Sequence, residues 1–137
     1  MPQEATVIDC HTHAFRDAAQ GLNAMGGAPR VGYAGLVDDL KAVRRKAGIQ
    51  TSVLLALLPS EGMRDAARAR LAPDLAPEQR ARAEEETNEA IIGRLQRMNA
   101  WVCDVARENP GILPFVNIGP FLDPERMRLE ILEKVEK

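Results

Sequence analysis

The chain has only two histidines, and both lie near its N-terminus in a segment that could bind a metal ion. They are His11 and His13, and the carboxylate of Asp9 precedes them with the same spacing of two residues. Side chains two residues apart in a β-strand point to the same face, so both imidazoles would project together with Asp9 just behind them. Two neutral imidazoles form half of a first-row metal site, with zinc the ion that we favour.

Each of these residues also has a simpler interpretation. His11 and His13 could be two unrelated polar residues at the end of a strand. We favour the metal site, because Asp-x-His-x-His at the end of a strand is a pattern that can bind a metal ion. Asp9 could orient an imidazole through the ring nitrogen that does not bind metal, or it could accept a hydrogen bond from the backbone. The sequence favours neither role for Asp9.

The same segment carries a family resemblance. Val-Ile-Asp-Cys-His-Thr-His at residues 7–13 resembles the first strand of the amidohydrolase superfamily of metal-dependent barrels. It is closer still to the amidohydrolase-2 branch, which includes relatives of aminocarboxymuconate-semialdehyde decarboxylase. Similarity of pattern continues at the family's first helix, second strand, long second helix and third strand, in residues 33–40, 47–53, 99–101, 109–111 and 113–115.

The resemblance implies an α/β fold in which residues 1–137 form the N-terminal portion of a single (β/α)8 TIM barrel domain. Such a barrel usually needs about 250 residues, so we expect three strand-helix units of a longer enzyme, with a long helical insertion at about 60–109. Family members complete the metal site with a histidine from a later strand and an aspartate from the eighth, which serves as general base. This chain has no third histidine, and we expect the catalytic residues beyond residue 137.

The activity implied by the resemblance is hydrolysis or non-oxidative decarboxylation of a small carboxylated or cyclic organic substrate. A divalent ion, zinc in the first place, would activate water or polarise a carbonyl or carboxylate group. The alternative is a non-catalytic truncated or assembly domain that keeps the His-x-His strand. Three parallel strands would expose an apolar face, so we expect a homo-oligomer or pairing with a missing C-terminal half.

The elements that would position the histidines alternate between strand and helix in the first half of the chain. The pattern predicts strands at about 6–13 and 51–58, with a glycine-rich loop at 21–29 between them. A helix is predicted at about 34–47, with Gly48 as its left-handed cap. Its apolar stripe is Leu36, Leu40, Val43 and Ala47.

The second half of the chain reads as mostly helical. We predict a short helix at 64–72, a long helix that begins at Pro77 and stops at Asn109, and a third strand at about 112–121. Asp123 and Pro124 mark the cap and first turn of a last helix. The core stripe of the long helix is Ile91, Leu95, Met98, Val102 and Val105.

The composition limits the kinds of partner that we expect for this chain. The formal net charge of −2 and the 4% of aromatic residues argue against a nucleic-acid partner. No apolar run approaches the ~20 residues of a membrane span, and no signal peptide is evident, so we expect a cytoplasmic protein. Cys10 and Cys103 are too few for a disulfide framework, and we expect both to be small buried residues.

Overall fold

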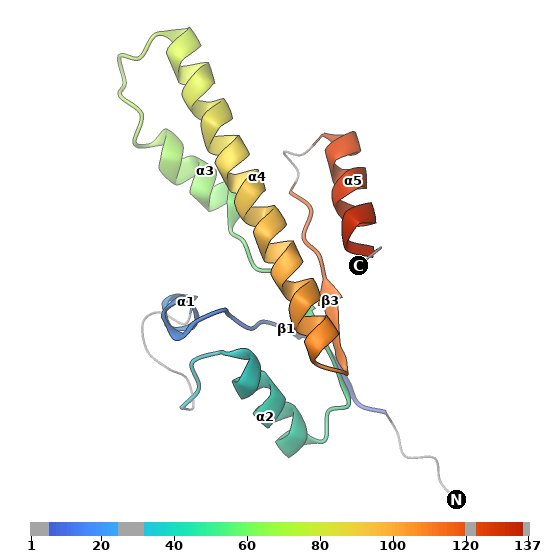
Figure 1. Ribbon diagram of the computed structural model, residues 1–137. Helices are drawn as coiled ribbons and strands as arrows, with labels where there is room; N and C mark the ends of the chain where they lie inside the picture. Colours follow the sequence, from blue (N-terminus) through green and yellow to red (C-terminus); the bar gives the residue numbers. More distant parts are fainter. Residues whose placement is uncertain (1–5, 25–31, 120–122, 136–137) are drawn as a thin grey trace, which may run out of the picture. The chain divides into compact units, whose positions relative to one another are not determined.

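The computed structural model describes residues 6–24, 32–119 and 123–135, which form an α/β fold with a parallel three-stranded sheet (Figure 1). Its elements are β1 (Ile8–Thr12), α1 (Ala18–Ala24), α2 (Val37–Ala47), β2 (Thr51–Leu55), α3 (Ser60–Arg68), α4 (Pro77–Glu108), β3 (Ile112–Phe115) and α5 (Pro124–Val135). They form two compact units, which we describe separately. The sheet unit comprises the residues up to Ala56 together with 102–115, and the helical unit comprises 57–101 and 116–137.

The sheet has the strand order β1-β2-β3, and both pairs of neighbours are parallel. The strands lie where the sequence predicts them, but all three are shorter than expected. β2 ends at Leu55 and α3 begins at Ser60, and the last pair in the ladder between β2 and β3 is Leu55 with Phe115. The last two residues of the predicted third strand, 120–121, lie outside the described residues.

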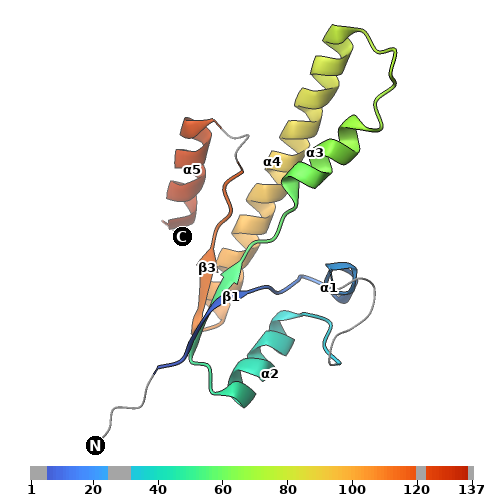
Figure 2. The same cartoon turned by 180° about the vertical axis from the view of Figure 1, so that it is seen from behind.

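One face of the sheet is buried. Ser52 and Leu54 of β2 are fully buried, and Ile112 of β3 is 3% exposed. Figures 1 and 2 show the C-terminal part of α4 lying against this face, where Val102 is also fully buried. The packing of these side chains is the core of the sheet unit, and their burial drives its folding.

The opposite face of the sheet carries exposed apolar side chains. Leu113 and Phe115 lie on it with exposed fractions of 51% and 58%, and Ile8 of β1 is 58% exposed. We expected β2 to be buried on both faces, because its sequence is continuously apolar. The structure buries only alternate residues of β2, so that expectation is wrong for the second face.

Several local features differ from the sequence prediction. The short helix predicted at 64–72 is α3, which runs over Ser60–Arg68. Residues 21–24, expected in a loop, belong to α1, where Gly21 is buried against the backbone of Ala34. In α2, Arg44 is 8% exposed while Val43 of the predicted stripe is 38% exposed, so the buried face is turned by one residue. The Gly48 cap is confirmed, with φ of 67° and its N–H directed at the carbonyls of Arg44 and Arg45.

The helical unit is built around the N-terminal part of α4. Ile91, Ile92 and Leu95 form its core with Leu58, and partly buried side chains of α3 and α5 pack around them. Arg126 of α5 donates two hydrogen bonds to Glu89 of α4, at 2.6 and 2.9 Å. This pairing holds the pKa of Glu89 below its usual value. The predicted cap of α5 is confirmed, since Asp123 accepts a 3.0 Å hydrogen bond from the backbone of Arg126.

Two glycines with similar backbone angles should respond differently to alanine. Gly111 has φ of 83° and Gly48 has φ of 67°, a region that costs a non-glycine residue about 1–2 kcal/mol. A Cβ on Gly48 would meet open space, whereas one on Gly111 would overlap the Arg44 guanidinium and the Gln50 carbonyl. We expect Gly48→Ala to lower the free energy of unfolding by about 1 kcal/mol and Gly111→Ala by about 3 kcal/mol or more. Urea denaturation of the two variants measures this, and equal losses would contradict the close packing at Gly111.

Candidate metal centre

His11 and His13 lie at the C-terminal end of β1, and an irregularity in that strand decides which way they point. Asp9 pairs with Ser52 and Thr12 pairs with Leu54, so three steps along β1 match two steps along β2. The extra residue is a β-bulge, which reverses the alternation of faces. Thr12 is consequently on the buried face at 9% exposure, and the histidines on either side of it project from the open face.

The backbone around the histidines is held on both sides. The Thr12 hydroxyl donates a 2.8 Å hydrogen bond to the carbonyl of Val53. After His13, the buried Ala14 anchors the chain, and the backbone N–H of Phe15 donates to the carbonyl of Gly35 at 2.8 Å. These contacts fix the backbone on which both imidazoles are carried.

The two imidazoles meet through their Nε2 atoms, which are 3.2 Å apart. Their rings are almost perpendicular, at 89°, with centroids separated by 4.9 Å. Nδ1 of His13 lies 3.3 Å from the carbonyl oxygen of Leu55. A carbonyl only accepts, so this contact places the proton of neutral His13 on Nδ1 and leaves a lone pair on Nε2.

This geometry fits a shared metal ion. Zinc binds histidine nitrogen at about 2.0–2.1 Å with tetrahedral angles, which puts two ligand nitrogens about 3.3–3.4 Å apart. The observed 3.2 Å between the Nε2 atoms of His11 and His13 is close to that value. The Leu55 contact is the kind of outer hydrogen bond that fixes a metal-binding imidazole in one tautomer. The same 3.2 Å is a hydrogen-bond distance, in which His11 donates from Nε2 to the free Nε2 of His13. An ion would therefore take the place of the proton on Nε2 of His11.

The residues beside the histidines do not extend this ligand pair. Oδ1 of Asp9 accepts a 3.2 Å hydrogen bond from the backbone N–H of His11. Of the two roles that the sequence left open for Asp9, this is the hydrogen bond to the backbone and not the orientation of an imidazole. Asp9 pairs with Ser52 before the bulge, so it does not share the face of the histidines as simple alternation predicts. Across the described ranges, no three side chains of His, Cys, Asp or Glu gather closely enough to hold a metal. Two imidazoles are therefore the ligands that the described part of the chain supplies.

The sequence predicted that both cysteines are buried, and the structure does not bury Cys10. Cys103 is half-buried, but Cys10 is exposed, so the expectation of a buried residue is wrong there. Cys10 lies between Asp9 and Thr12, where the irregular pairing removes it from the regular alternation of the strand.

Sequence reasoning missed two polar groups that the structure places in buried positions. Asn99 is fully buried in α4, where it binds Asn117 and Glu130. Its signal was available, because Asn99 follows Leu95 by four residues within the same helical stripe. Arg44 gave no such signal, since a cation near the end of a helix normally lies in solvent.

Comparisons with protein families, with characterised proteins and with solved structures find no match to this chain. The structure adds one finding on membranes. Among the helices that it describes, none combines the length and apolar character needed to cross a bilayer.

Proposed function

We propose that this chain supplies two imidazole ligands, His11 and His13, to the divalent metal centre of a metal-dependent hydrolase or decarboxylase. The single observation that carries the proposal is the 3.2 Å separation of the two Nε2 atoms at the C-terminal end of a parallel strand. Zinc is the ion that we favour for two nitrogen ligands of this geometry.

The sheet is compatible with a (β/α)8 barrel of the amidohydrolase kind. Parallel strands in the order β1-β2-β3 are what the first units of such a barrel would show. The histidines lie at the carboxyl end of a strand, where barrel enzymes keep their chemistry. The open face that carries the histidines would then be the barrel interior.

Within this proposal, the described residues hold and orient the ion. His11 and His13 bind it, and the Leu55 carbonyl keeps His13 in the tautomer that leaves Nε2 free. A bound divalent ion supplies Lewis-acid activation of water or of a substrate carbonyl. The remaining ligands and the general base would come from outside this chain's 137 residues, as would the groups that choose between hydrolysis and decarboxylation of a small carboxylated or cyclic substrate.

The proposal is tested on the protein as it is made in cells. Elemental analysis of the full-length protein should find one divalent first-row ion per chain, and its His11→Ala/His13→Ala variant should contain none. The isolated 137-residue chain should bind the ion weakly or appear empty, because half of the site is missing from it. If the reading frame continues past Lys137, further strand-helix units with a histidine and an aspartate at strand ends should appear. Equal metal content in the wild type and the variant would refute the assignment.

The exposed face of the sheet favours a second candidate, a non-catalytic assembly domain. Leu113, Phe115 and Ile8 are each more than half exposed on one side of the three strands. Soluble monomers rarely expose a contiguous apolar patch of this kind, so a partner surface is expected here. β1 and β3 also each have a free edge among the described strands.

We expect the isolated 137-residue chain to self-associate through this face. Light scattering at increasing concentration should give a mass above the 15.0 kDa of one chain. Leu113→Thr/Phe115→Thr should shift the species toward the monomer, because it removes apolar area while introducing β-branched residues that suit a strand. A wild-type chain that stays monomeric, with a cooperative denaturant melt, would contradict this expectation.

A further inference from the structure

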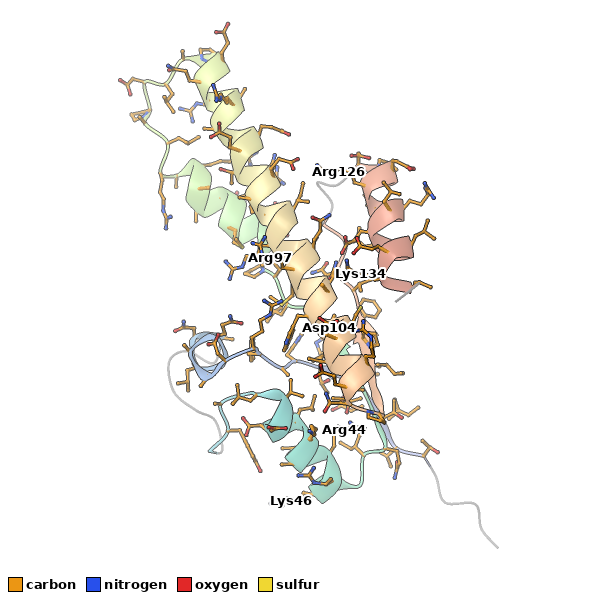
Figure 3. The ribbon with its side chains drawn as sticks, viewed as in Figure 1. Arg44, Lys46, Arg97, Asp104, Arg126 and Lys134 are labelled. Carbon is orange, nitrogen blue, oxygen red and sulfur yellow. The ribbon has the colours of Figure 1, made fainter. Side chains whose placement is uncertain are left out.

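A second candidate site lies in the sheet unit, away from the histidine end of the strands. It is a cleft of about 380 Å³ between the C-terminal end of α2 and the segment that leads from α4 to β3. Figure 3 labels Arg44, which belongs to the α2 side of this cleft. The charged side chains that line it are Lys41, Arg44, Arg45 and Glu108.

Arg44 is the unusual member of this group. Only 8% of the residue is exposed, yet no carboxylate lies within ion-pair distance of it among the described residues. Its guanidinium donates to the carbonyl of Gln50, while its buried Nε has no hydrogen-bond partner there. A guanidinium has five N–H donors, and a buried charge is costly without a counter-ion. The partner that the described residues give this buried charge is a neutral carbonyl, and a bound anion would neutralise it.

The cations are not needed to satisfy the helix ends that border the cleft. At the end of α2, the carbonyls of Arg44 and Arg45 already accept backbone hydrogen bonds from Gly48 and Ile49. At the end of α4, the side-chain amide of Asn109 donates to the carbonyl of Val105 at 2.7 Å. Capping of free carbonyls, the ordinary use of basic residues at a helix C-terminus, thus does not account for this cluster.

We propose that this cleft binds the phosphate group of a small phosphorylated molecule. The lining holds three cations and one carboxylate, and Lys41 is also paired with Asp38 at 3.1 Å, so the charge that faces a phosphate of about −1.5 to −2 is net positive by one unit. Arginine suits this role because its planar fork binds two phosphate oxygens at once. The volume exceeds that of a phosphate ion and falls in the lower part of the range for small-molecule sites. A phosphomonoester fills the space better than free phosphate.

The experiment compares inorganic phosphate and glycerol 3-phosphate with chloride at constant ionic strength. Amide chemical shifts in a two-dimensional NMR titration should move saturably at Arg45, Ile49 and Asn109, and glycerol 3-phosphate should bind more tightly than phosphate. Lys41→Gln/Arg45→Gln should weaken binding by about tenfold or more, because it removes two charges from the lining. Neither side chain is buried, so the variant should remain folded.

Glu108→Gln and Arg82→Gln complete the test. Glu108→Gln removes the one carboxylate of the lining and should tighten phosphate binding severalfold. Arg82→Gln removes an exposed cation that does not line the cleft and should leave the binding unchanged. Shifts no larger than those with chloride, or equal binding by the wild type and the Lys41→Gln/Arg45→Gln variant, would overturn the proposal. Neither result would bear on metal binding by the histidines.

Discussion

Replacing both His11 and His13 with alanine is expected to abolish the binding of Zn²⁺ or Co²⁺ by this chain. Four-ligand structural zinc sites reach about 10–16 kcal/mol, so two imidazoles with water in the other positions should supply about half of that. This corresponds to a Kd from roughly 1 µM to 0.2 mM for the wild-type chain. Each single replacement should remove most of this affinity, because a lone imidazole holds an ion poorly. Calorimetric titration with zinc measures the affinity and the one-to-one stoichiometry.

Two neighbouring variants provide the control for this loss. Asp9→Asn keeps the Oδ1 acceptor that binds the His11 backbone, and Cys10→Ser changes an exposed thiol. Both should bind zinc within about twofold of the wild type, since neither residue is a ligand in the proposed site. Zinc binding that survives in His11→Ala/His13→Ala with unchanged affinity would remove the metal centre from consideration.

Asn99→Ala is expected to be among the most destabilising single changes in the helical unit, by about 3 kcal/mol. The Asn99 amide donates to the carbonyl of Asn117 and to Glu130, and its oxygen accepts from the Asn117 N–H, each at 2.9 Å. Alanine would leave the Glu130 carboxylate, which is 2% exposed, with a lost donor in a buried position. Urea denaturation should show a lower midpoint with little change in slope.

Further variants separate polar pairing from shape at this position. Asn99→Asp keeps the shape and the acceptor, but it places a second carboxylate beside Glu130, so it should destabilise at least as much as alanine. Asn99→Leu/Glu130→Leu removes both buried polar side chains and should recover part of the loss. If this double variant is as unstable as Asn99→Ala, the Glu130 carboxylate is not the source of the loss, and the Asn117 N–H and carbonyl, which lose their Asn99 partner in both variants, account for it.

The features that the sequence predicted are those set by neighbouring residues. The cap at Gly48, the start of α4 at Pro77 and the Asp123 cap of α5 depend on a few adjacent residues, and all three are confirmed. The apolar stripe of α4 was also readable, and four of its five members are buried. The pairing of the two imidazoles was predictable for the same reason, because a spacing of two residues along a strand brings both side chains to one face.

The features that the sequence did not predict depend on contacts between distant segments. The burial of Arg44 follows from the backbone of Gln50 and Gly111, which no pattern within α2 contains. The orientation of the histidines likewise depends on how β1 pairs with β2. The extra residue before Thr12 is seen only when the paired residues of the two strands are compared. Spacing predicted that the imidazoles share a face, while the pairing decided which face.

The bulge in β1 makes the number of residues before the histidines matter more than their identity. Cys10 is an exposed side chain, so exchange for another residue there would leave the direction of the imidazoles unaltered. Loss or gain of one residue between Asp9 and His11 would instead turn both imidazoles to the opposite face, into the layer occupied by Leu54. This segment of β1 should therefore tolerate substitutions at Cys10 but not insertions or deletions.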